Sequence, residues 1–379
     1  MSRVKVGVIG LGFIGPVHVE AIRRTGVAEV VAVCGNNFEK AQKKAAEMGV
    51  DRAYPDYKQL LADPEIEVVH ICTPNNLHYQ ISKEALLAGK HVVCEKPLAL
   101  EMEQCDELIE LGKKLNKVCA VNFNMRAYPI VQQVRDMIER GDLGEIFSIN
   151  GSYTQDWMLL DTDYSWRAEP KYTGCTRTVA DIGSHWFDMI EHICGQRVTS
   201  VCADFATFYK VRKRPLKPVE TYSGKILEPG DYEEIPVETE DYSTVLFRMG
   251  DKIHGSCTTC QTMAGRKNRL YFEIAGSKAM VAWDSEKCNE LWIGSREGAN
   301  QTLIRDASLM YPNAAGYTSY PGGHNEGFAD SMKHHMIRIY DDIINRSGAS
   351  HATFEDGRRE VEICNAVYES AVNEKWVKL

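Results

Sequence analysis

The sequence predicts an α/β chain: an N-terminal doubly wound parallel sheet, followed by an α+β domain on a large, mostly antiparallel open sheet. Three observations predict this fold class. The 379 residues are too many for one ordinary hydrophobic core. Residues 4–121 alternate short β-branched runs with segments of helical periodicity, as right-handed crossovers require. Residues 198–283 alternate apolar and polar positions without intervening helices, which favours antiparallel strands.

The elements of the first domain follow from this alternation. Its strands are nearly continuous apolar runs, typical of strands buried on both faces, and are expected at 4–9, 30–34, 68–73, 91–94 and 118–121. Its helices have apolar residues at helical spacing and are expected at 14–24, 40–48, 77–88 and 101–115. Glycines 26, 49 and 89 stand where helix-ending glycines are expected.

The pattern changes after a further helix at 130–139. Strands are expected at 145–153, 198–208, 243–248, 253–261, 270–274 and 280–283, and helices at 326–344 and 355–375, with Thr353 as N-cap of the last. The stretch 212–240 is rich in Pro, Gly and charge and is expected to be a surface excursion with few core residues. We therefore expect a dinucleotide-binding domain at 1–124, a substrate and oligomerisation domain at 125–350, and a helix at 351–379 that packs back near the first domain.

Composition restricts the partners. The chain is 44% hydrophobic and 26% charged, with 53 acidic against 44 basic residues, which is typical of a globular protein without the basic footprint of nucleic-acid or anionic-membrane binding. No apolar stretch approaches the roughly 20 residues of a membrane span. The opening Met-Ser-Arg runs directly into a strand at Val4, so we expect no secretory signal and a reducing, cytoplasmic location for the twelve cysteines. Cys257 and Cys260 form an isolated C-x-x-C, so no metal is expected.

A glycine-rich turn follows the first strand. The sequence Gly10-Leu11-Gly12-Phe13-Ile14-Gly15 is a G-x-G-x-x-G between a strand and a helix, the context of a Rossmann dinucleotide site. Gly10 permits the tight turn, Gly12 lets the pyrophosphate approach the backbone, and Gly15 allows close helix packing. The phosphates are expected at the helix N-terminus.

The end of the second strand lacks the acid that usually binds the ribose hydroxyls. Asn36 and Asn37 stand there instead, and either an Asn–ribose hydrogen bond or a 2′-phosphate is compatible with them. Lys40 and Lys43 are either neighbours of such a phosphate or, as we favour, solvated helix charges. We expect NAD as the cofactor and leave NADP open.

Two further strand ends face the cofactor side of the sheet, because ligands bind at the carboxyl ends of parallel strands. One carries Thr73, Pro74, Asn75 and His78, and the other carries Glu95-Lys96-Pro97. Downstream stands Asp181-Ile182-Gly183-Ser184-His185, followed by Asp188. At α-helical spacing, positions 181, 185 and 188 share one face.

With the glycine-rich turn, Glu-Lys-Pro and Asp-x-Gly-x-His together, the chain resembles the Gfo/Idh/MocA oxidoreductases over essentially its whole length. The resemblance implies hydride transfer between a secondary alcohol and a nicotinamide cofactor. It implies that Lys96 and His185 share the hydroxyl proton, that Asp181 holds the substrate, and that Asn124, Trp166 and Arg167 reach the cofactor.

Residues 153–167 concentrate aromatic and polar side chains that suit a sugar, which offers apolar faces and hydroxyls. The expected substrate-binding residues are Lys96, Tyr153, Asp156, Arg167, Asp181, His185 and His324. Gln155, Trp157, Tyr164 and Trp166 belong to the same stretch. The motif around Asp181, with the downstream Arg-Lys-Pro segment and Pro-Gly-Gly-His, is most similar to the family branch that oxidises glucosides at the 3-hydroxyl.

Two alternatives remain: an inositol or free-sugar dehydrogenase, and a non-catalytic NAD(P)-binding sensor or regulator. Retention of Lys96, Asp181 and His185 favours an enzyme. Family relatives cover the second sheet by pairing it across a symmetry axis, so the resemblance implies a homodimer or homotetramer.

Overall fold

The computed structural model describes residues 3–216, 230–348 and 350–379, in two compact units. The first comprises Met1–Ala127 with Phe328–Val361, and the second comprises Tyr128–Gly327 with Glu362–Leu379. None of the helices in the described ranges is long and apolar enough to cross a membrane.

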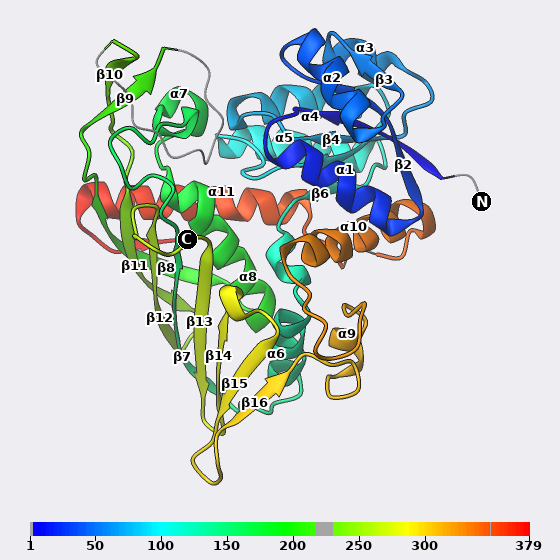
Figure 1. The fold of residues 1–379 in the computed structure, drawn as a ribbon. Coiled ribbons are helices and arrows are strands. Elements are labelled where there is room, and N and C mark those ends of the chain that lie inside the picture. Colours follow the sequence, from blue (N-terminus) through cyan, green and yellow to red (C-terminus); the bar gives the residue numbers. More distant parts are fainter. Residues whose placement is uncertain (1–2, 217–229, 349) are drawn as a thin grey trace. The chain divides into compact units, whose positions relative to one another are not determined.

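The first unit is built on a six-stranded parallel sheet in the order β3-β2-β1-β4-β5-β6 (Figure 1). Its strands are β1 (Val4–Ile9), β2 (Ala28–Cys34), β3 (Arg52–Tyr54), β4 (Val68–Ile71), β5 (His91–Cys94) and β6 (Cys119–Val121). This is the strand order of a dinucleotide-binding Rossmann domain. The sequence did not predict β3, because three half-buried residues leave no hydrophobic run.

Helices cover both faces of this sheet. They are α1 (Ile14–Thr25), α2 (Phe38–Met48), α3 (Tyr57–Ala62), α4 (His78–Leu87), α5 (Met102–Lys114) and α10 (Phe328–Asn345), with 3-10 turns η1 (Asn75–Leu77) and η2 (Asn124–Ala127). The core on one face includes Met332, Met336, Ile339 and Tyr340 of α10. The sequence placed α10 in the second domain, but these side chains fill the Rossmann core, and so the helix belongs to the first unit.

The second unit is built on a nine-stranded sheet in the order β16-β15-β14-β13-β7-β12-β11-β8-β17. The pair β7–β12 is parallel and the other pairs are antiparallel. The strands are β7 (Ile146–Thr154), β8 (Val198–Ala206), β11 (Tyr242–Met249), β12 (Ile253–Cys260), β13 (Arg269–Gly276), β14 (Met280–Asp284), β15 (Glu290–Gly294), β16 (Gln301–Ile304) and β17 (Val377–Lys378). The predicted α+β class is confirmed.

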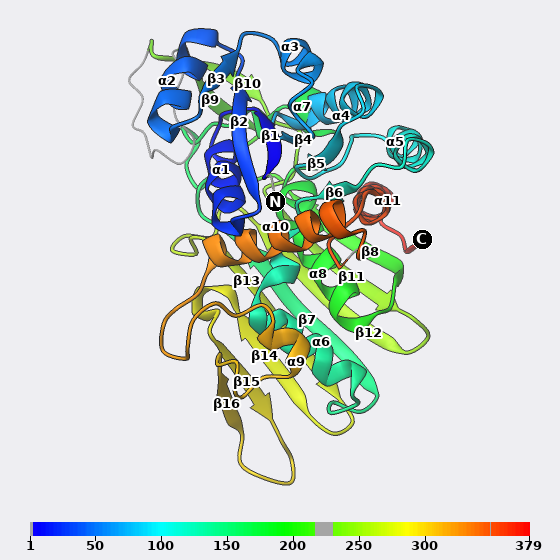
Figure 2. The same ribbon diagram turned by 90° about the vertical axis from the view of Figure 1, so that its right-hand side faces the viewer.

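One face of this sheet carries α8 (Ser184–Cys194), beside which α6 (Pro129–Glu139) lies (Figure 2). Trp186 and Phe187 of α8 make edge contacts with Phe247 of β11, at 5.7 and 5.8 Å between ring centroids. Gly151 of β7 gives Trp186 room, because a Cβ there would lie 2.7 Å from its indole nitrogen. These contacts fix α8, whose first turn carries His185, on the sheet.

Shorter elements complete this unit. They are η3 (Trp166–Ala168), α7 (Pro170–Thr173), the π-turn η4 (Val179–Gly183), η5 (Ser285–Lys287) and α9 (Pro312–Ala315). The helix expected at 355–375 is α11 (Phe354–Asn373). The chain after Val361 belongs to the second unit, where β17 pairs with β8 and the amide of Ala203 donates to Ser370. The expected third segment is thus divided between the two units.

The structure of the described part of 212–240 differs from the surface excursion that the sequence predicts. This stretch contributes to a two-stranded sheet of β9 (Val211–Pro215) and β10 (Tyr232–Pro236), while residues 217–229 lie outside the described part. The Arg212 side chain is fully buried, and Val237 joins a small core with Met158 and Ala168. The expectation of few core residues was wrong, because buried ion pairs let charged residues serve as interior ones.

Candidate functional site

The glycine-rich turn of the first unit has the geometry that its pattern predicts. Gly10 has φ +97°, and a Cβ there would lie 2.4 Å from the carbonyl oxygen of Cys72. At Gly15 a Cβ would lie 2.1 Å from the carbonyl oxygen of Gly10. Gly12 differs, because nothing lies within 4 Å of its Cβ position. The open space over Gly12 is a cradle that a larger side chain would fill.

The helix after this turn begins without a side-chain cap, at Phe13, and has no acid in its first turn. Its first amides therefore suit an anionic ligand such as a pyrophosphate. Ile14 begins the helix, and Lys44 of α2 donates to the carbonyl of Leu11 at 2.5 Å. The turn thus fits a dinucleotide.

The asparagines after β2 have different surroundings. Asn37 caps α2 by accepting from the amide of Lys40 at 2.9 Å, whereas Asn36 is exposed. Lys43 lies 3.9 Å from Glu47 on the solvent side of α2. Of the lysines on this helix, Lys44 is the one whose ammonium contacts the glycine-rich turn, and sequence reasoning overlooked it.

His78 is fully buried and links two strand-end loops. Its Nδ1 lies 2.7 Å from the carbonyl of Pro97 and its Nε2 lies 2.9 Å from that of Thr73. Burial lowers the pKa of His78, and the two carbonyls oppose that shift. Pro74 and Asn75 lie between, where η1 begins. A neutral imidazole carries a single N–H, so His78 donates to one of these two carbonyls and lies beside the other, between the two loops.

Glu95 directly follows β5 and belongs to a buried hydrogen-bond network. Its carboxylate lies 2.9 Å from Nε2 of His18 on α1 and 2.5 Å from the Asn122 amide that donates to it. Although burial raises the pKa of Glu95, these hydrogen bonds and the charge of nearby Lys96 bring it to about 2. Nδ1 of His18 lies 2.8 Å from Nδ1 of His70. Glu95 thus connects α1 to the loop that carries Lys96.

Lys96 and Asn124 complete the predicted residues of this unit. Lys96 is partly exposed, and its backbone amide donates to Glu95 at 3.3 Å. Asn124 is buried at the start of η2, and its side-chain amide donates to Ser331 of α10 at 2.8 Å.

In the second unit, Asp181 lies in the π-turn η4 and His185 in the first turn of α8. The expectation of regular α-helical spacing from 181 was wrong, because residues 179–183 form a wider turn, of the kind frequent at functional sites. Asp188 is 1% exposed and belongs to the interior.

The Asp181 carboxylate is held from two sides. Its Oδ1 accepts from Nε of Arg167 at 3.2 Å, and its Oδ2 accepts from the side-chain amide of Gln261 at 2.7 Å. The Arg167 guanidinium lies 4.4 Å from the ring centroid of Trp166, a favourable cation–π distance. The structure therefore brings Arg167 into contact with Asp181 and places Trp166 beside Arg167.

His185 lies next to Tyr153 of β7, with 6.4 Å between their ring centroids. The Tyr153 hydroxyl donates to Asn268 at 2.8 Å. The Gln155 amide donates to the same oxygen at 2.8 Å, and the Trp157 indole donates to Gln155 at 2.7 Å. Because Gln261 lies 3.3 Å from Gln155, this polar network continues to Asp181.

Other predicted residues lie apart from this network. Asp156 accepts from Lys267 at 2.7 Å and from the amide of Gly265 at 3.1 Å. Tyr164 donates to Glu169. His324 is exposed, and its ring nitrogen lies 3.3 Å from the carbonyl of Pro321.

Sequence reasoning missed Gln261, although it directly contacts Asp181. Gln261 follows β12 and is fully buried. Its signal was a polar residue directly after a strand, similar to the strand-end position that singled out Lys96 in the parallel sheet. An antiparallel sheet gives no rule for which strand end forms a site, and so the position was not selected.

Among the described residues, no group of three or more His, Cys, Asp or Glu side chains is placed to hold a metal ion. The twelve cysteines are free thiols, including Cys257 and Cys260.

Two family models match the chain. Residues 4–123 match the oxidoreductase family with an NAD-binding Rossmann fold, and residues 131–282 match the GFO/IDH/MocA C-terminal domain. The first unit is therefore an NAD-binding domain.

Curated relatives agree with the family. A levoglucosan dehydrogenase of Pseudarthrobacter phenanthrenivorans is 30% identical over 393 residues, covering 100% of this chain and 98% of the relative. A D-glucoside 3-dehydrogenase of Escherichia coli is 37% identical, covering 38% and 42% of the two chains. An inositol 2-dehydrogenase/D-chiro-inositol 3-dehydrogenase of Lactiplantibacillus plantarum is 35% identical, covering 50% and 51%.

The fold agrees as well. A solved levoglucosan dehydrogenase in complex with NADH and levoglucosan has a TM-score of 0.87 and 28% identity, covering 100% of this chain and 99% of that one. The chain belongs to the Gfo/Idh/MocA family and is an NAD-dependent dehydrogenase acting on CH–OH groups.

Proposed function

We propose that this enzyme oxidises a glucoside at its 3-hydroxyl by transferring a hydride to NAD. The observation that carries the proposal is the environment of the π-turn. Asp181 is held there by Arg167 and Gln261, and His185 lies beside Tyr153. This arrangement offers a carboxylate for a sugar hydroxyl and an imidazole for its proton.

The chemistry assigns one role to each of three residues. The C–H bond of the substrate's carbinol carbon breaks and a carbonyl forms there. The proton of the carbinol hydroxyl passes to the Lys96–His185 pair, which shares it. Lys96 at the end of β5 and His185 on α8 act as the acid–base pair. Asp181 accepts a hydrogen bond from a neighbouring hydroxyl and orients the ring. NAD, when bound, accepts the hydride.

The residues proposed to hold the cofactor come from the first unit, with Trp166 and Arg167 from the second. Gly12 and the first amides of α1 receive the pyrophosphate, since the helix start is uncapped and the space over Gly12 is open. The others in this proposed set are Gly10, Phe13, Ile14, Gly15, Asn36, Asn37, Thr73, Pro74, Asn75, His78, Glu95, Lys96 and Asn124. Of these, His78 and Glu95 act by holding the loops, because their side chains are engaged with protein groups.

Aromatic side chains around Asp181 and His185 support a sugar as substrate. Tyr153, Trp157 and Trp166 offer ring faces to sugar C–H groups, while Gln155 and Asp156 offer polar atoms. We also assign Asp156 and His324, which lie apart from this group, to substrate binding. The similarity to a D-glucoside 3-dehydrogenase favours the 3-hydroxyl. The similarity to an inositol dehydrogenase makes inositol the second candidate.

The experiment is a panel of glucosides, free sugars and inositols, with NADH formation followed by absorbance. We expect glucosides to be oxidised with the highest kcat/KM and the product carbonyl to be at C3 by NMR. Turnover of inositols alone, or a carbonyl at another carbon, would overturn the substrate assignment. Absence of turnover with every compound would overturn the proposed substrate class. We place the reaction in the cytoplasm, consistent with twelve free thiols.

A further inference from the structure

The turn that carries Asp181 begins without a cap of its own. Thr178 is its N-cap residue, but its side chain makes no capping hydrogen bond. The turn continues directly into α8, so residues 179–194 form one helical segment. Helix N-terminal amides need acceptors when they are buried. Thr178 and Val179 are fully buried, and so the acceptor must come from elsewhere in the protein.

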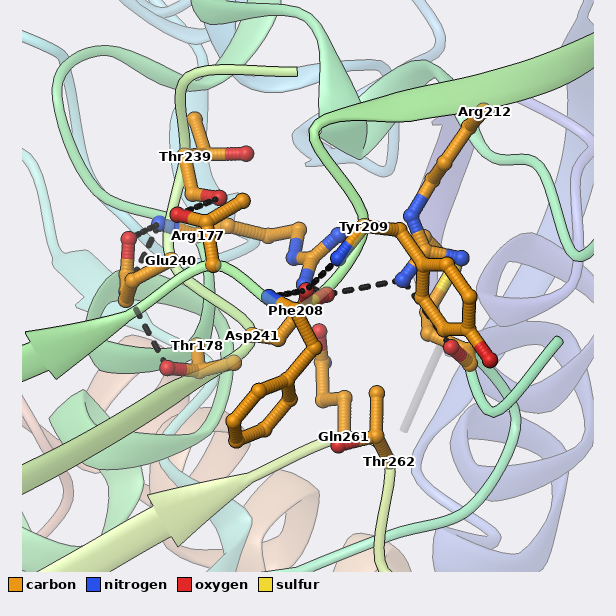
Figure 3. Close-up of polar contacts among 12 residues, drawn as sticks. Arg177, Thr178, Phe208, Tyr209, Arg212, Thr239, Glu240, Asp241, Gln261 and Thr262 are labelled. Atoms are coloured by element: carbon orange, nitrogen blue, oxygen red, sulfur yellow. Dashed lines mark hydrogen bonds and ion pairs between the residues drawn. The ribbon is translucent and has the colours of Figure 1, made fainter. Parts of the chain in front are cut away.

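Glu240 supplies this acceptor from a distant part of the sequence (Figure 3). Its Oε1 accepts from the amide of Val179 at 2.9 Å and from the hydroxyl of Thr178 at 3.1 Å. Its Oε2 accepts from the amide of Arg177 at 2.8 Å. The Glu240 residue is 2% exposed. A buried carboxylate at a helix N-terminus is stabilised by the free amides and by the helix dipole.

Asp241, the residue after Glu240, binds two buried arginines. The carboxylate of Asp241 accepts from the Arg177 guanidinium and, at 2.7 Å, from Nη2 of Arg212. The side chains of these three residues are fully buried. Two arginines and Asp241 leave one positive charge, which an ionised Glu240 neutralises. Burial raises the pKa of Glu240, while the amides of Val179 and Arg177 and the Arg177 charge oppose the rise.

A second connection leads from Asp241, the residue before β11, to the Asp181 side chain. The backbone amide of Gln261 donates to the carbonyl of Asp241 at 3.1 Å. The side-chain amide of Gln261 donates to Oδ2 of Asp181 at 2.7 Å. Glu240 thus holds the backbone of the turn, and the neighbouring Gln261 holds its carboxylate.

We propose that Glu240 is a positioning residue for sugar oxidation: by capping the turn that carries Asp181, it sets the orientation of Asp181 and His185 towards the substrate. This inference rests on the proposed function. It assigns a role in catalysis to the 212–240 stretch, which the sequence presented as a surface excursion. Glu240 contacts no reacting atom and acts through the turn alone.

The test compares Glu240, whose buried carboxylate binds the start of the helical segment, with a buried carboxylate near the segment's end. Glu240→Gln removes the charge at the start of the segment. Glu191→Gln is the matched control, because Glu191 is also buried, near the end of α8, and accepts from the amide of Val198 at 2.7 Å. Both variants should lose thermal stability. Only Glu240→Gln should lower kcat for the sugar, by roughly tenfold, since small misplacements of catalytic groups cost up to about a hundredfold. NAD affinity should be unchanged in both.

A milder variant and a spectroscopic readout keep the test decisive. Thr178→Val removes one donor to Glu240 and should lower kcat by a smaller factor, even if Glu240→Gln does not fold. The His185 ring resonances, assigned by their absence from His185→Ala, should shift in Thr178→Val and Glu240→Gln but not in Glu191→Gln.

The outcomes separate this inference from the proposed function. If no sugar is oxidised, the proposed function fails, while the His185 resonances still show whether Glu240 sets the turn. Equal losses of kcat in Glu240→Gln and Glu191→Gln would contradict the inference. So would unchanged His185 resonances in the foldable Glu240 and Thr178 variants.

Discussion

At the scale of single residues, the glycines of the turn have distinct roles that mutation separates. Gly12→Val should leave the fold intact, because nothing lies within 4 Å of its Cβ position, but should weaken NAD binding by at least about tenfold as the side chain fills the phosphate cradle. Gly10→Ala is the contrast: it should destabilise the protein, because φ is +97° and a Cβ would lie 2.4 Å from a carbonyl oxygen. Calorimetry with NAD and thermal melts measure both. A Gly12→Val protein that retains full affinity would contradict the assignment of this turn.

The acid–base pair gives a second prediction at this scale. Lys96→Ala and His185→Ala should each lower kcat by roughly a hundredfold to ten-thousandfold, the usual range for positioned acid–base groups. NAD affinity should change far less. Asp181→Asn should raise the KM for the sugar more than it lowers kcat, because an amide retains one acceptor. Steady-state kinetics with each variant check these values, and a His185→Ala enzyme as active as wild type would exclude His185 as part of the pair.

At the scale of elements, Glu95 connects β5, α1 and β6, and its ionisation should make stability depend on acid pH. Its pKa falls from 4.5 to about 2 in the folded protein. A carboxylate with a lowered folded pKa stabilises the fold above its unfolded pKa, by up to about 3 kcal/mol here, and the contribution is lost as pH falls through the folded value. The stability gap between wild type and Glu95→Gln should therefore be largest near neutral pH and shrink between pH about 4.5 and about 2. Chemical unfolding across this range measures the gap, and a constant gap would show that Glu95 is not ionised as described.

The elements also show where sequence patterns succeed. Except for β3 and α3, which were not predicted, the strands and helices of the Rossmann domain were predicted within a few residues, because each buried strand is an apolar run and each helix has its own periodicity. The π-turn at 179–183 was not predicted, since it is held by Glu240, about sixty residues later in the chain. Local periodicity carries no signal of such a distant cap. The buried Arg212 was missed for the same reason, because its partner Asp241 stands almost thirty residues later, just before β11.

At the scale of the whole molecule, the family resemblance and the local patterns each selected some of the candidate site residues. The glycine-rich turn and Lys96 followed from parallel-sheet rules, and Asp181 and His185 followed from their motif. Gln261 and Lys44 were missed, since their contacts with Asp181 and Leu11 depend on tertiary packing. Glu95 and His78 were expected to bind the cofactor. Their side chains form buried contacts with His18 and with the carbonyl of Pro97, which hold the strand-end loops. Residue type alone does not reveal such contacts.

Assembly gives a prediction at the same scale. Leu246 and Trp292 lie on the face of the nine-stranded sheet opposite the buried Val245 and Val281, and are 48% and 38% exposed. We expect this face to be covered by a second copy of the chain, giving a homodimer or homotetramer. Light scattering at micromolar concentration should show the oligomer, and Leu246→Asp should shift it towards monomer. A monomeric wild-type protein would contradict this assembly.

The origin of the hydride tests the central claim most directly. A glucoside carrying deuterium at C3 should give singly deuterated NADH, detected by mass spectrometry, while the same glucoside deuterated at C2 or C4 should give unlabelled NADH. Unlabelled NADH from the C3-deuterated glucoside would contradict oxidation at the 3-hydroxyl.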